Sequence, residues 1–397
     1  MHNKANEVVA IGGVRTPMSN FGGTLKDFSV YELGKFAIKG VLEKAKISAN
    51  EIDEVFGGNT RQAGNGPNPV RSAACLAGID VKVPAATINN ACPSSMKATI
   101  IATQNILVGD NKVALVVGME SMSTIPYLIK GIRWQGLRMG DHVLQDGWGD
   151  SVDPVVGFGM GITAENIAQK YGISRNEQDA FALSSHHKAA LAQDNGWFDE
   201  EIIPIEIPGK KGKPNIIFAK DESIRRDTTL EKMAALKPSF KTDGSVTAAN
   251  SCGLTDGAAS IILTTRKKAN ELGVKPLFKI VSYATAAVDN AYMGEGPGVS
   301  IPMALKKAGM SLKDMDLIEV NEAFAVQILA NERMLKWDRS KLNVHGGAIA
   351  LGHPTGCSGV RLLITSYNAL RRLNKEFAVC AICGGGGPTC AVVIQAE

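Results

Sequence analysis

A cysteine at position 92 stands where a thiol could act as a nucleophile. It lies in the segment 89–94, which reads Asn-Asn-Ala-Cys-Pro-Ser, between a predicted strand and a predicted helix. Because proline is pre-organised for the first helical position, we expect Pro93 at that position and Cys92 at the N-cap. A thiolate there would lie at the positive end of the helix dipole, which lowers the pKa of a thiol. The alternative is that Cys92 is an unreactive, buried apolar side chain.

A second cysteine, Cys383, ends a predicted strand and precedes a run of glycines. Together with Cys380 it has the CxxC spacing that also occurs in metal and redox sites. Residues three apart on a strand point to opposite faces, so we expect the two thiols to point apart. No second CxxC pair accompanies them. The sequence therefore predicts neither a metal site nor a redox pair at these cysteines.

Two further segments place polar side chains beside predicted elements. Asn321 follows a strand, where a side chain can face a ligand, although capping of the next helix explains it equally well. His353 lies in the glycine-rich segment 346–356, which leads into a helix, and its imidazole could be the base for a thiol. The glycines could instead hold a phosphate, but the Gly-Lys-Ser/Thr ending of a P-loop is missing.

Alternating apolar strands and amphipathic helices must position these residues. Strands are predicted at 7–11, 52–58, 85–89, 112–118, 258–264, 316–321 and 377–382. Helices are predicted at 30–45, 94–107, 163–171, 175–195 and 354–373. This alternation predicts an α/β fold with a buried sheet.

The last third of the chain repeats the first. Strand 316–321 parallels strand 52–58, and the helix and strand after residue 354 parallel those after Cys92, at a separation of about 265 residues. We infer an internal duplication of about 120–150 residues. The stretch from about residue 121 to 249 has a different composition and is interpreted as an insertion between strands.

Length and composition narrow the function classes. The chain has 397 residues, of which 45% are hydrophobic and 21% charged, as expected of a globular protein. A net charge of +4 is too small to indicate nucleic-acid binding. No apolar run of about 18 residues is present, so no membrane span is predicted. Seven cysteines without a secretory signal indicate reduced thiols, and we expect a cytoplasmic location.

Taken together, these segments resemble the thiolase family over the whole chain. Further matching segments are Gly-Met-Glu-Ser-Met-Ser at 118–123, Met-Gly-Ile-Thr-Ala-Glu-Asn at 160–166, and 247–259, which begins Thr-Ala-Ala-Asn-Ser-Cys-Gly. The resemblance implies a layered αβαβα fold built from two duplicated α/β core domains. It implies an N-terminal core domain at 1–120 and 250–273, a loop domain that binds coenzyme A at 121–249, and a C-terminal core domain at 274–397.

The resemblance also assigns chemical roles. Cys92 matches the nucleophile that carries the acyl group as a thioester, and His353 matches the base that activates it. Cys383 matches the acid and base at the substrate α-carbon. Asn321 matches the residue that positions a catalytic water, which with His353 would form one oxyanion hole. The backbone amides of Cys92 and Gly385 would form the other.

The same resemblance implies a binding site for coenzyme A and an acyl chain. Arg225 matches an arginine that contacts coenzyme A, and a guanidinium suits phosphate recognition. Residues matching the walls of the pantetheine or acyl tunnel are Met160, Phe240, Ala248, Cys252, Ala323 and Phe324. Acyl-CoA and coenzyme A are the implied partners, as substrates and not as a permanently bound cofactor. A homo-oligomer, either a dimer or a tetramer, is also implied.

Four positions depart from the family pattern, and none is a predicted catalytic residue. Ser95 and Pro388 replace glycines, Cys252 replaces a serine, and Gly159 stands where acetoacetyl-specific members often have a histidine. A small residue at 159 would open space near the acyl group. The acyl pocket is therefore either wider than one built for acetoacetyl-CoA, or that of a short-chain acetyl-CoA acetyltransferase.

Two other functions share part of this pattern. A ketoacyl synthase has the same fold but acts on carrier-protein thioesters, and lacks an Asn-Glu-Ala-Phe segment and a late Cys-x-Gly. A non-catalytic acyl-CoA-binding paralogue would be expected to have lost a reactive residue. All four predicted reactive side chains are present, which favours thiolase chemistry.

Overall fold

The computed structural model describes residues 6–209, 212 and 214–397, which form ten strands of one large mixed sheet and two strands of a small one. The strands are β1 (Val8–Arg15), β2 (Ser19–Asn20), β3 (Glu54–Gly58), β4 (Ala85–Ile88), β5 (Val113–Ser121), β6 (Ile205–Ile207), β7 (Ile216–Phe218), β8 (Thr255–Thr265), β9 (Phe278–Ala287), β10 (Leu317–Val320), β11 (Phe377–Cys383) and β12 (Pro388–Ala396). The α-helices are α1 (Val30–Ala45), α2 (Pro69–Leu76), α3 (Ser94–Val108), α4 (Ile132–Gln135), α5 (Met160–Tyr171), α6 (Arg175–Asp194), α7 (Leu230–Ala234), α8 (Arg266–Glu271), α9 (Gly296–Ala308), α10 (Ala325–Leu335), α11 (Ala348–Leu351) and α12 (Thr355–Leu373).

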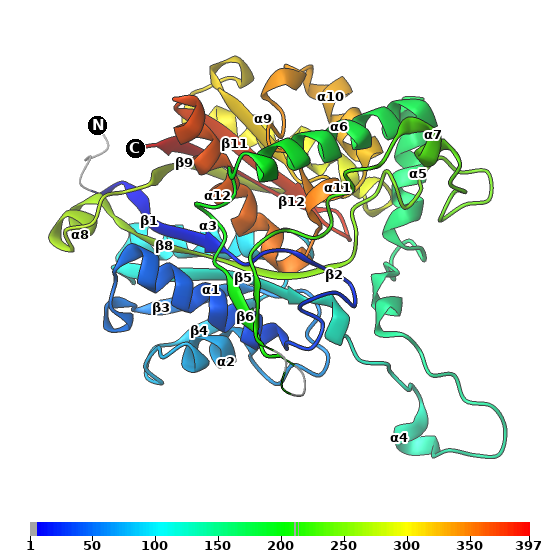
Figure 1. Ribbon diagram of the computed structural model, residues 1–397, viewed down its shortest axis with the longest axis horizontal. Helices are drawn as coiled ribbons and strands as arrows, with labels where there is room; N and C mark the ends of the chain where they lie inside the picture. Colours follow the sequence, from blue (N-terminus) through cyan, green and yellow to red (C-terminus); the bar gives the residue numbers. More distant parts are fainter. Residues whose placement is uncertain (1–5, 210–211, 213) are drawn as a thin grey trace.

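The large sheet consists of two halves with the same strand order (Figure 1). One half runs β1-β8-β5-β3, with β4 added at its edge, and the other runs β9-β12-β11-β10. In each half the first two pairings are antiparallel and the third is parallel. The halves join through a short pairing of β1 with β9, at Val9 and Ala10. The internal repeat predicted from the sequence is therefore confirmed.

Helices complete five layers around these two halves. Helices α1 and α2 cover the outer face of the first half, and α9 and α10 cover that of the second. The equivalent helices α3 and α12 pack against each other in the middle layer and contact strands of both halves (Figure 1). The order is the αβαβα arrangement expected from the sequence.

The middle helices approach the first half closely because that half presents glycines to them. A Cβ atom on Gly58 would lie 2.4 Å from the Ser95 backbone nitrogen, and one on Gly118 would lie 2.7 Å from the Gly356 carbonyl oxygen. Any side chain at these two positions would push α3 or α12 outward. The glycines therefore fix where the N-termini of both middle helices lie.

Most predicted elements are confirmed, and several further elements were not predicted. Helix α1 has the predicted bounds and starts with a capping box between Ser29 and Glu32. The elements that were not predicted are strands β2, β6, β7, β9 and β12 and helices α2, α4, α7, α8, α9, α10 and α11. Helix α9 begins with Gly-Pro-Gly and contains Pro302, residues that disfavour a helix locally. Packing on β9 and β12 stabilises it instead.

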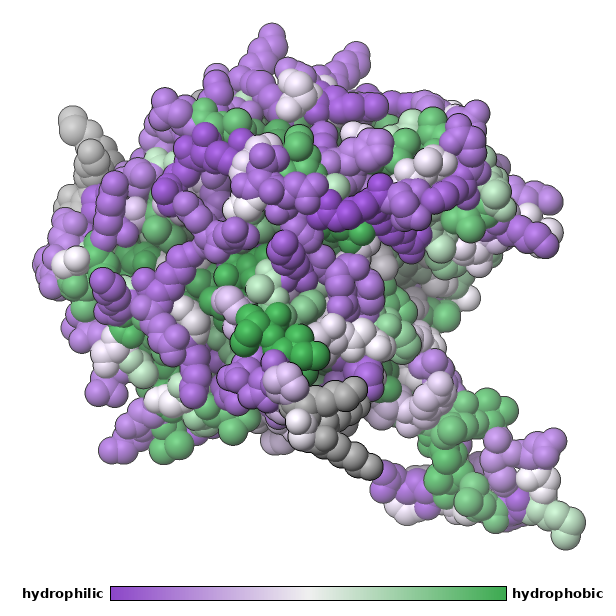
Figure 2. Space-filling view, viewed as in Figure 1, coloured by the Kyte–Doolittle hydropathy of each residue, from purple (hydrophilic) through white to green (hydrophobic). Residues whose placement is uncertain are grey.

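The segment between β5 and β8 contains the predicted helices α5 and α6 and a projecting arm, residues 125–146. The arm extends away from the body and carries α4 (Figure 1). Its apolar side chains form a hydrophobic surface (Figure 2), and Trp134 and Val143 are 91% and 82% exposed. Exposed apolar patches of this kind mark interaction surfaces.

The described helices were also searched for membrane spans. None of them is both long enough and apolar enough to cross a bilayer. The cytoplasmic location stays a prediction.

A buried arginine ties the segment between β5 and β8 to the first half of the sheet. Arg15, at the end of β1, is inaccessible to solvent and makes a bidentate pair with Asp221 at 2.7 and 2.8 Å. Its Nε also donates to Glu201 at 2.6 Å. Both carboxylates come from loops after α6, so these loops are fixed against β1 by charge-assisted hydrogen bonds.

Replacing this arginine should destabilise the protein strongly. Arg15→Met would leave Asp221 and Glu201 buried without their cation, and we expect the free energy of unfolding to fall by about 3–5 kcal/mol. Urea unfolding followed by tryptophan fluorescence measures the change. Lys26→Met, which removes an exposed ion pair with Asp27, is the control and should have little effect. Equal effects of the two substitutions would contradict this prediction.

Candidate active site

A cavity of about 890 Å³ lies at the N-terminal end of α3, between the two halves of the sheet and α5. Its wall is mainly apolar, with a few polar groups, as is typical of small-molecule sites. Eight of the residues predicted from the sequence line it, namely Cys92, Met160, Phe240, Cys252, Ala323, Phe324, His353 and Gly385. Segments more than 200 residues apart thus contribute to one site.

Cys92 lies just before α3, one residue farther from the first turn of the helix than the expected N-cap position. The helix begins at Ser94 with Pro93 as N-cap, so Cys92 is not itself the cap. Ala91 has a φ of 52°, a left-handed conformation that is uncommon for a residue with a side chain. Gly384 allows the opposite loop to approach, because a Cβ there would lie 2.5 Å from the Pro93 ring. The backbone N–H of Gly385 thereby reaches the Cys92 sulfur.

The expectation of a lowered thiol pKa at Cys92 is wrong for the free protein. Burial raises the pKa of this thiol to about 11, because a thiolate would lose its hydration. The hydrogen bond from Gly385 and the nearby charge of Arg61 oppose this effect without overcoming it. Cys92 is therefore a neutral thiol at rest and needs a base to become a nucleophile.

His353 has the position and the neutral resting state that such a base requires. Its Nδ1 lies 2.7 Å from the Ser358 hydroxyl, which itself donates to the Pro354 carbonyl at 3.1 Å. The hydroxyl must then accept from Nδ1–H, which leaves the Nε2 lone pair free to take a proton. Burial, together with the charge of Arg361, lowers the pKa of His353 to about 3, so the resting imidazole is neutral.

Asn321 lies beside this imidazole and does not cap a helix. Its Nδ2 is 3.4 Å from His353 Nε2, and its backbone N–H donates to Ala381 of β11. Helix α10 starts four residues later, with Phe324 as its N-cap, which excludes the capping interpretation. Within the described residues, the buried Oδ1 atom of Asn321 has no hydrogen-bond partner.

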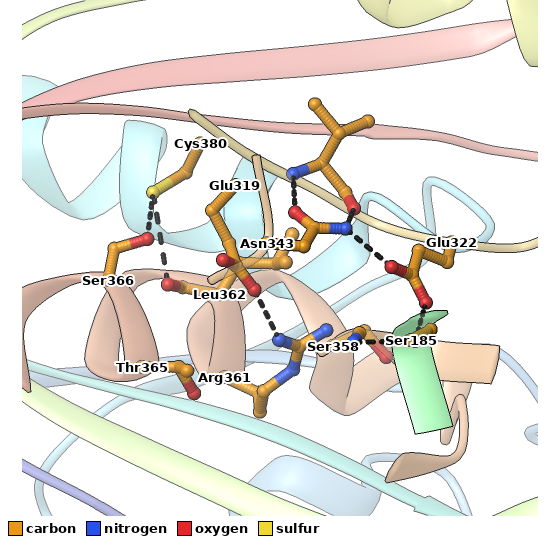
Figure 3. Close-up of polar contacts among 12 residues, drawn as sticks. Ser185, Glu319, Glu322, Asn343, Ser358, Arg361, Leu362, Thr365, Ser366 and Cys380 are labelled. Atoms are coloured by element: carbon orange, nitrogen blue, oxygen red, sulfur yellow. Dashed lines mark hydrogen bonds and ion pairs between the residues drawn. The ribbon is translucent and has the colours of Figure 1, made fainter. Parts of the chain in front are cut away.

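Cys383 and Cys380 point to opposite faces of β11, as predicted. Cys380 belongs to the core around the middle helices and contacts the Ser366 hydroxyl on α12 (Figure 3). Cys383 belongs to the core of the second half, on the other face. Burial raises the pKa of Cys383, and a charge on nearby Cys92 raises it further. The Cys383 thiol is thus also protonated at rest.

A buried polar network fixes the loop that carries His353 (Figure 3). The Glu322 carboxylate accepts from Ser185 at 2.6 Å, from Asn343 at 2.8 Å and from the Ile349 backbone N–H at 3.2 Å. Asn343 in turn pairs with both backbone groups of Val320, next to Asn321. The loop of His353 and the strand end of Asn321 therefore hold each other in place.

A second buried carboxylate, Glu120, joins the other side of the site. It accepts from Asn59 and from the backbone N–H groups of Thr60 and Arg61, at 2.7 to 3.1 Å. It also accepts from Thr355 and from the Gly356 backbone N–H, at 2.7 and 2.8 Å. Glu120 thus caps the N-terminus of α12, where a negative charge is stabilised, and links it to the loop after β3.

The cavity does not include every predicted site residue. Asn321 and Cys383 are buried and are not among its lining residues. Arg225 and Ala248 are exposed and lie outside the residues that line it. The Arg225 backbone N–H donates to His186 Nδ1, which orients the loop but not the guanidinium. Contacts of these two residues with a ligand stay predictions.

Several lining residues were missed by the sequence analysis. They include Arg61, Trp148, Ser151, Asp153 and Met293. Arg61 follows the glycines that end β3, and a polar residue after a strand of a parallel pair is a recognisable signal. The others lie on irregular segments, for which sequence periodicity gives no signal.

The part of the chain that the structure describes contains no cluster of metal ligands. No group of three or more His, Cys, Asp or Glu side chains there is arranged to hold a metal ion. In particular, the CxxC pair points apart.

Comparison with known families matches nearly the whole chain. Residues 8–267 match the family model described as thiolase, N-terminal domain, and residues 274–396 match thiolase, C-terminal domain. The chain is 44% identical to an acetyl-CoA acetyltransferase of Cupriavidus necator, with 98% of this chain and 99% of that protein covered. It is 46% identical to an acetyl-CoA acetyltransferase of Pseudomonas aeruginosa, with 98% and 100% covered.

Solved structures give the same result. Human mitochondrial 3-ketoacyl-CoA thiolase superposes with a TM-score of 0.95 at 42% identity, covering 100% of both chains. A structure of the human protein in complex with CoA has the same score and identity over 99% of both chains. The acetyl-CoA acetyltransferase of Bacillus anthracis has a TM-score of 0.96 at 41% identity, covering 100% of both chains.

The raised pKa of Cys92 predicts how its reactivity depends on pH. Because the thiolate is the reactive form, the rate of alkylation by iodoacetamide should rise steadily from about pH 6 to about pH 9. Mass spectrometry of the Cys92 peptide measures the rate, and Cys92→Ala is the blank. A rate that is already constant at about pH 6 would mean that the resting thiol is ionised, contrary to this prediction.

Proposed function

The chain belongs to the thiolase family, and we propose that it cleaves a 3-ketoacyl-CoA with coenzyme A, giving acetyl-CoA and a shortened acyl-CoA. The observation that carries this proposal is the meeting of the protonated thiol Cys92 and the neutral base His353 at one apolar cavity, with the buried, protonated thiol Cys383 close enough to Cys92 for their charges to interact. The reverse reaction is the Claisen condensation of two acyl-CoA molecules. Coenzyme A is here a substrate and not a resident cofactor.

In the first half-reaction the Cys92 sulfur attacks the 3-keto carbon while His353 Nε2 takes the thiol proton. The bond between C2 and C3 then breaks, and its electron pair leaves on C2 as the enolate of acetyl-CoA. The Cys383 thiol donates its proton to C2, which releases acetyl-CoA. The acyl group remains on Cys92 as a thioester, in the manner of nucleophilic catalysis with a separate acid.

In the second half-reaction coenzyme A replaces acetyl-CoA in the cavity. The Cys383 thiolate takes the proton of the coenzyme A thiol, whose sulfur attacks the thioester carbon. The bond from carbon to the Cys92 sulfur breaks, and this sulfur regains its proton from His353. The enzyme returns to its starting state, so the kinetics are ping-pong.

Negative charge develops on a different oxygen in each half-reaction, which calls for two sets of donors. The backbone amides of Cys92 and Gly385 suit the thioester oxygen, because the Gly385 N–H already reaches the Cys92 sulfur. Asn321 and His353 suit the other oxygen, and Asn321 acts there through a water that it positions. Each donor of an oxyanion hole contributes roughly 3–4 kcal/mol to lowering a barrier.

The remaining parts of the chain suit binding and assembly. The division into core domains at 1–120 with 250–273 and at 274–397, and a loop domain at 121–249, follows the two halves of the sheet and the segment between them. Arg225 in the loop domain would contact coenzyme A. The apolar arm, residues 125–146, would pack on another copy in a dimer or tetramer.

Gly159 supports an acyl pocket wider than one built for acetoacetyl-CoA. It lines the cavity as the N-cap of α5, and a Cβ there would meet only the Ser151 carbonyl oxygen, at 3.7 Å. The space that a side chain would fill is therefore open to substrate.

Separate roles of the two thiols can be tested by substitution. Cys92→Ala should abolish acylation by acetyl-CoA and all turnover. Cys383→Ala should still be acylated, because a CoA thiolate leaves without a proton, but condensation should fall by about 10²–10⁴-fold for want of a base at C2. Intact-protein mass and steady-state rates measure both, with Cys75→Ala, outside the cavity, as control. Loss of acylation in both variants alike would contradict separate roles.

The open space at Gly159 predicts an effect on chain length. Gly159→His should lower kcat/KM for longer 3-ketoacyl-CoA substrates relative to acetoacetyl-CoA, because the imidazole would occupy acyl space. Gly159→Ala adds only an ordinary contact and is the matched control. A panel of substrates of graded length, with coenzyme A in excess, measures the ratio. Cleavage of acetoacetyl-CoA alone by the unchanged protein would overturn the wide-pocket proposal.

A further inference from the structure

Two neighbouring polar links join the segment of β10 to helix α12. The first lies in the candidate active site, where Asn321 Nδ2 is 3.4 Å from His353 Nε2 and the Ser358 hydroxyl holds the other ring nitrogen. The second is an ion pair between Glu319 and Arg361, with Oε1 and Nη1 2.8 Å apart (Figure 3). No step of the proposed mechanism uses this ion pair.

The spacing of these residues puts the ion pair next to the imidazole. Glu319 and Asn321 are two positions apart in an extended segment, so their side chains point to the same face of the strand. The backbone N–H of Asn321 still pairs with β11, which keeps that segment extended. Ser358 and Arg361 are three positions apart on α12, so they lie on one face of the helix with Cβ atoms about 5–6 Å apart. The charge of Arg361 accordingly acts on His353.

Both ions of this pair are buried. The Arg361 and Glu319 side chains are 2% and 5% exposed, and among the described residues no other carboxylate lies within ion-pair distance of Arg361. Little water is present to screen buried charges, so their fields act on neighbouring groups more strongly than at the surface. The net charge beside His353 therefore depends on whether Glu319 is ionised.

Other titratable groups also face Glu319, from the segments packed around it. They are Glu322 after β10, Cys380 on β11, Lys188 on α6 and Glu201 after α6. Burial keeps the Cys380 thiol neutral, because it raises the pKa of that group to about 12. Burial, with help from the two carboxylates, raises the pKa of Glu319 to about 7, although Arg361 opposes this effect. Glu319 therefore changes its charge near neutral pH.

We propose that Glu319 and Arg361 are positioning residues that tune His353 as the base of the reaction. With Glu319 ionised, the pair is neutral overall, and an imidazolium can form at His353 when Cys92 gives up its proton. With Glu319 protonated or removed, Arg361 is unbalanced and repels the imidazolium, so this proton transfer slows. The inference rests on the proposed thiolase function, in which His353 takes that proton, and adds two residues to it.

The test measures the rate at which acetyl-CoA acylates Cys92, by intact-protein mass after rapid mixing. Glu319→Gln can still accept from Arg361 but lacks the negative charge, so acylation should slow about tenfold, the effect of one pKa unit at the base. The double variant Glu319→Gln with Arg361→Met removes both charges and should recover most of the rate. Glu332→Gln, in a surface pair with Arg339, is the control and should leave the rate unchanged.

The pH profile gives a second readout, which a role in packing alone would not produce. In the unchanged protein acylation should slow as the pH falls through about 7, because protonation of Glu319 leaves Arg361 unbalanced. Glu319→Gln should be slow throughout and lack this fall. The double variant should be fast throughout and lack it too, a comparison that holds even where Glu319→Gln alone does not fold.

Several results would overturn the inference and leave the thiolase function standing. Equal slowing in Glu319→Gln and in the double variant would assign the pair a role in packing only. An unchanged rate in Glu319→Gln, or the same fall with pH in the variants as in the unchanged protein, would overturn it as well. Absence of acylation at Cys92 in the unchanged protein would overturn the proposed function, and the inference with it.

Discussion

The site depends on one buried carboxylate more than on any other single group. Glu120, at the end of β5, accepts hydrogen bonds from the loop after β3 and from the first turn of α12. These two segments come from different halves of the repeat, and no local interaction along the chain brings them together. By satisfying orphan backbone donors of both, Glu120 sets the distance between the wall that carries Arg61 and the loop that carries His353.

Burial then sets the chemistry of the groups that this framework brings together. Desolvation raises the pKa of the thiols Cys92 and Cys383 and lowers that of the His353 imidazole, so these three groups are neutral at rest. In the proposed mechanism they become charged only when substrate arrives and a proton moves from Cys92 to His353. The dipole of α3, which dominates at an exposed helix start, has less influence than loss of water does here.

The sequence predicted the order of most elements because their residues have clear apolar periodicity. Helix α1 and the middle helices α3 and α12 carry such patterns, and the chemical motifs lie beside them. Helix α9 escaped prediction because glycines and prolines hide its pattern and packing on the sheet stabilises it. Strands β9 and β12 were missed although both carry apolar, β-branched runs. The motif residues were identified by type and spacing. Arg61 and Trp148 belong to no motif and were identified only from their positions in the folded structure.

By itself, the sequence predicted the repeat, the candidate reactive residues and the opposite directions of Cys380 and Cys383. These depend on local periodicity and on side-chain type, which are present in the chain before it folds. Only the tertiary structure decided the ionisation of Cys92 and His353 and the tautomer of the imidazole. It also decided the pairing of Arg61 with Trp148 beside the space at Gly159. Those properties depend on desolvation and on contacts between segments distant in sequence, which exist only once the two halves have packed.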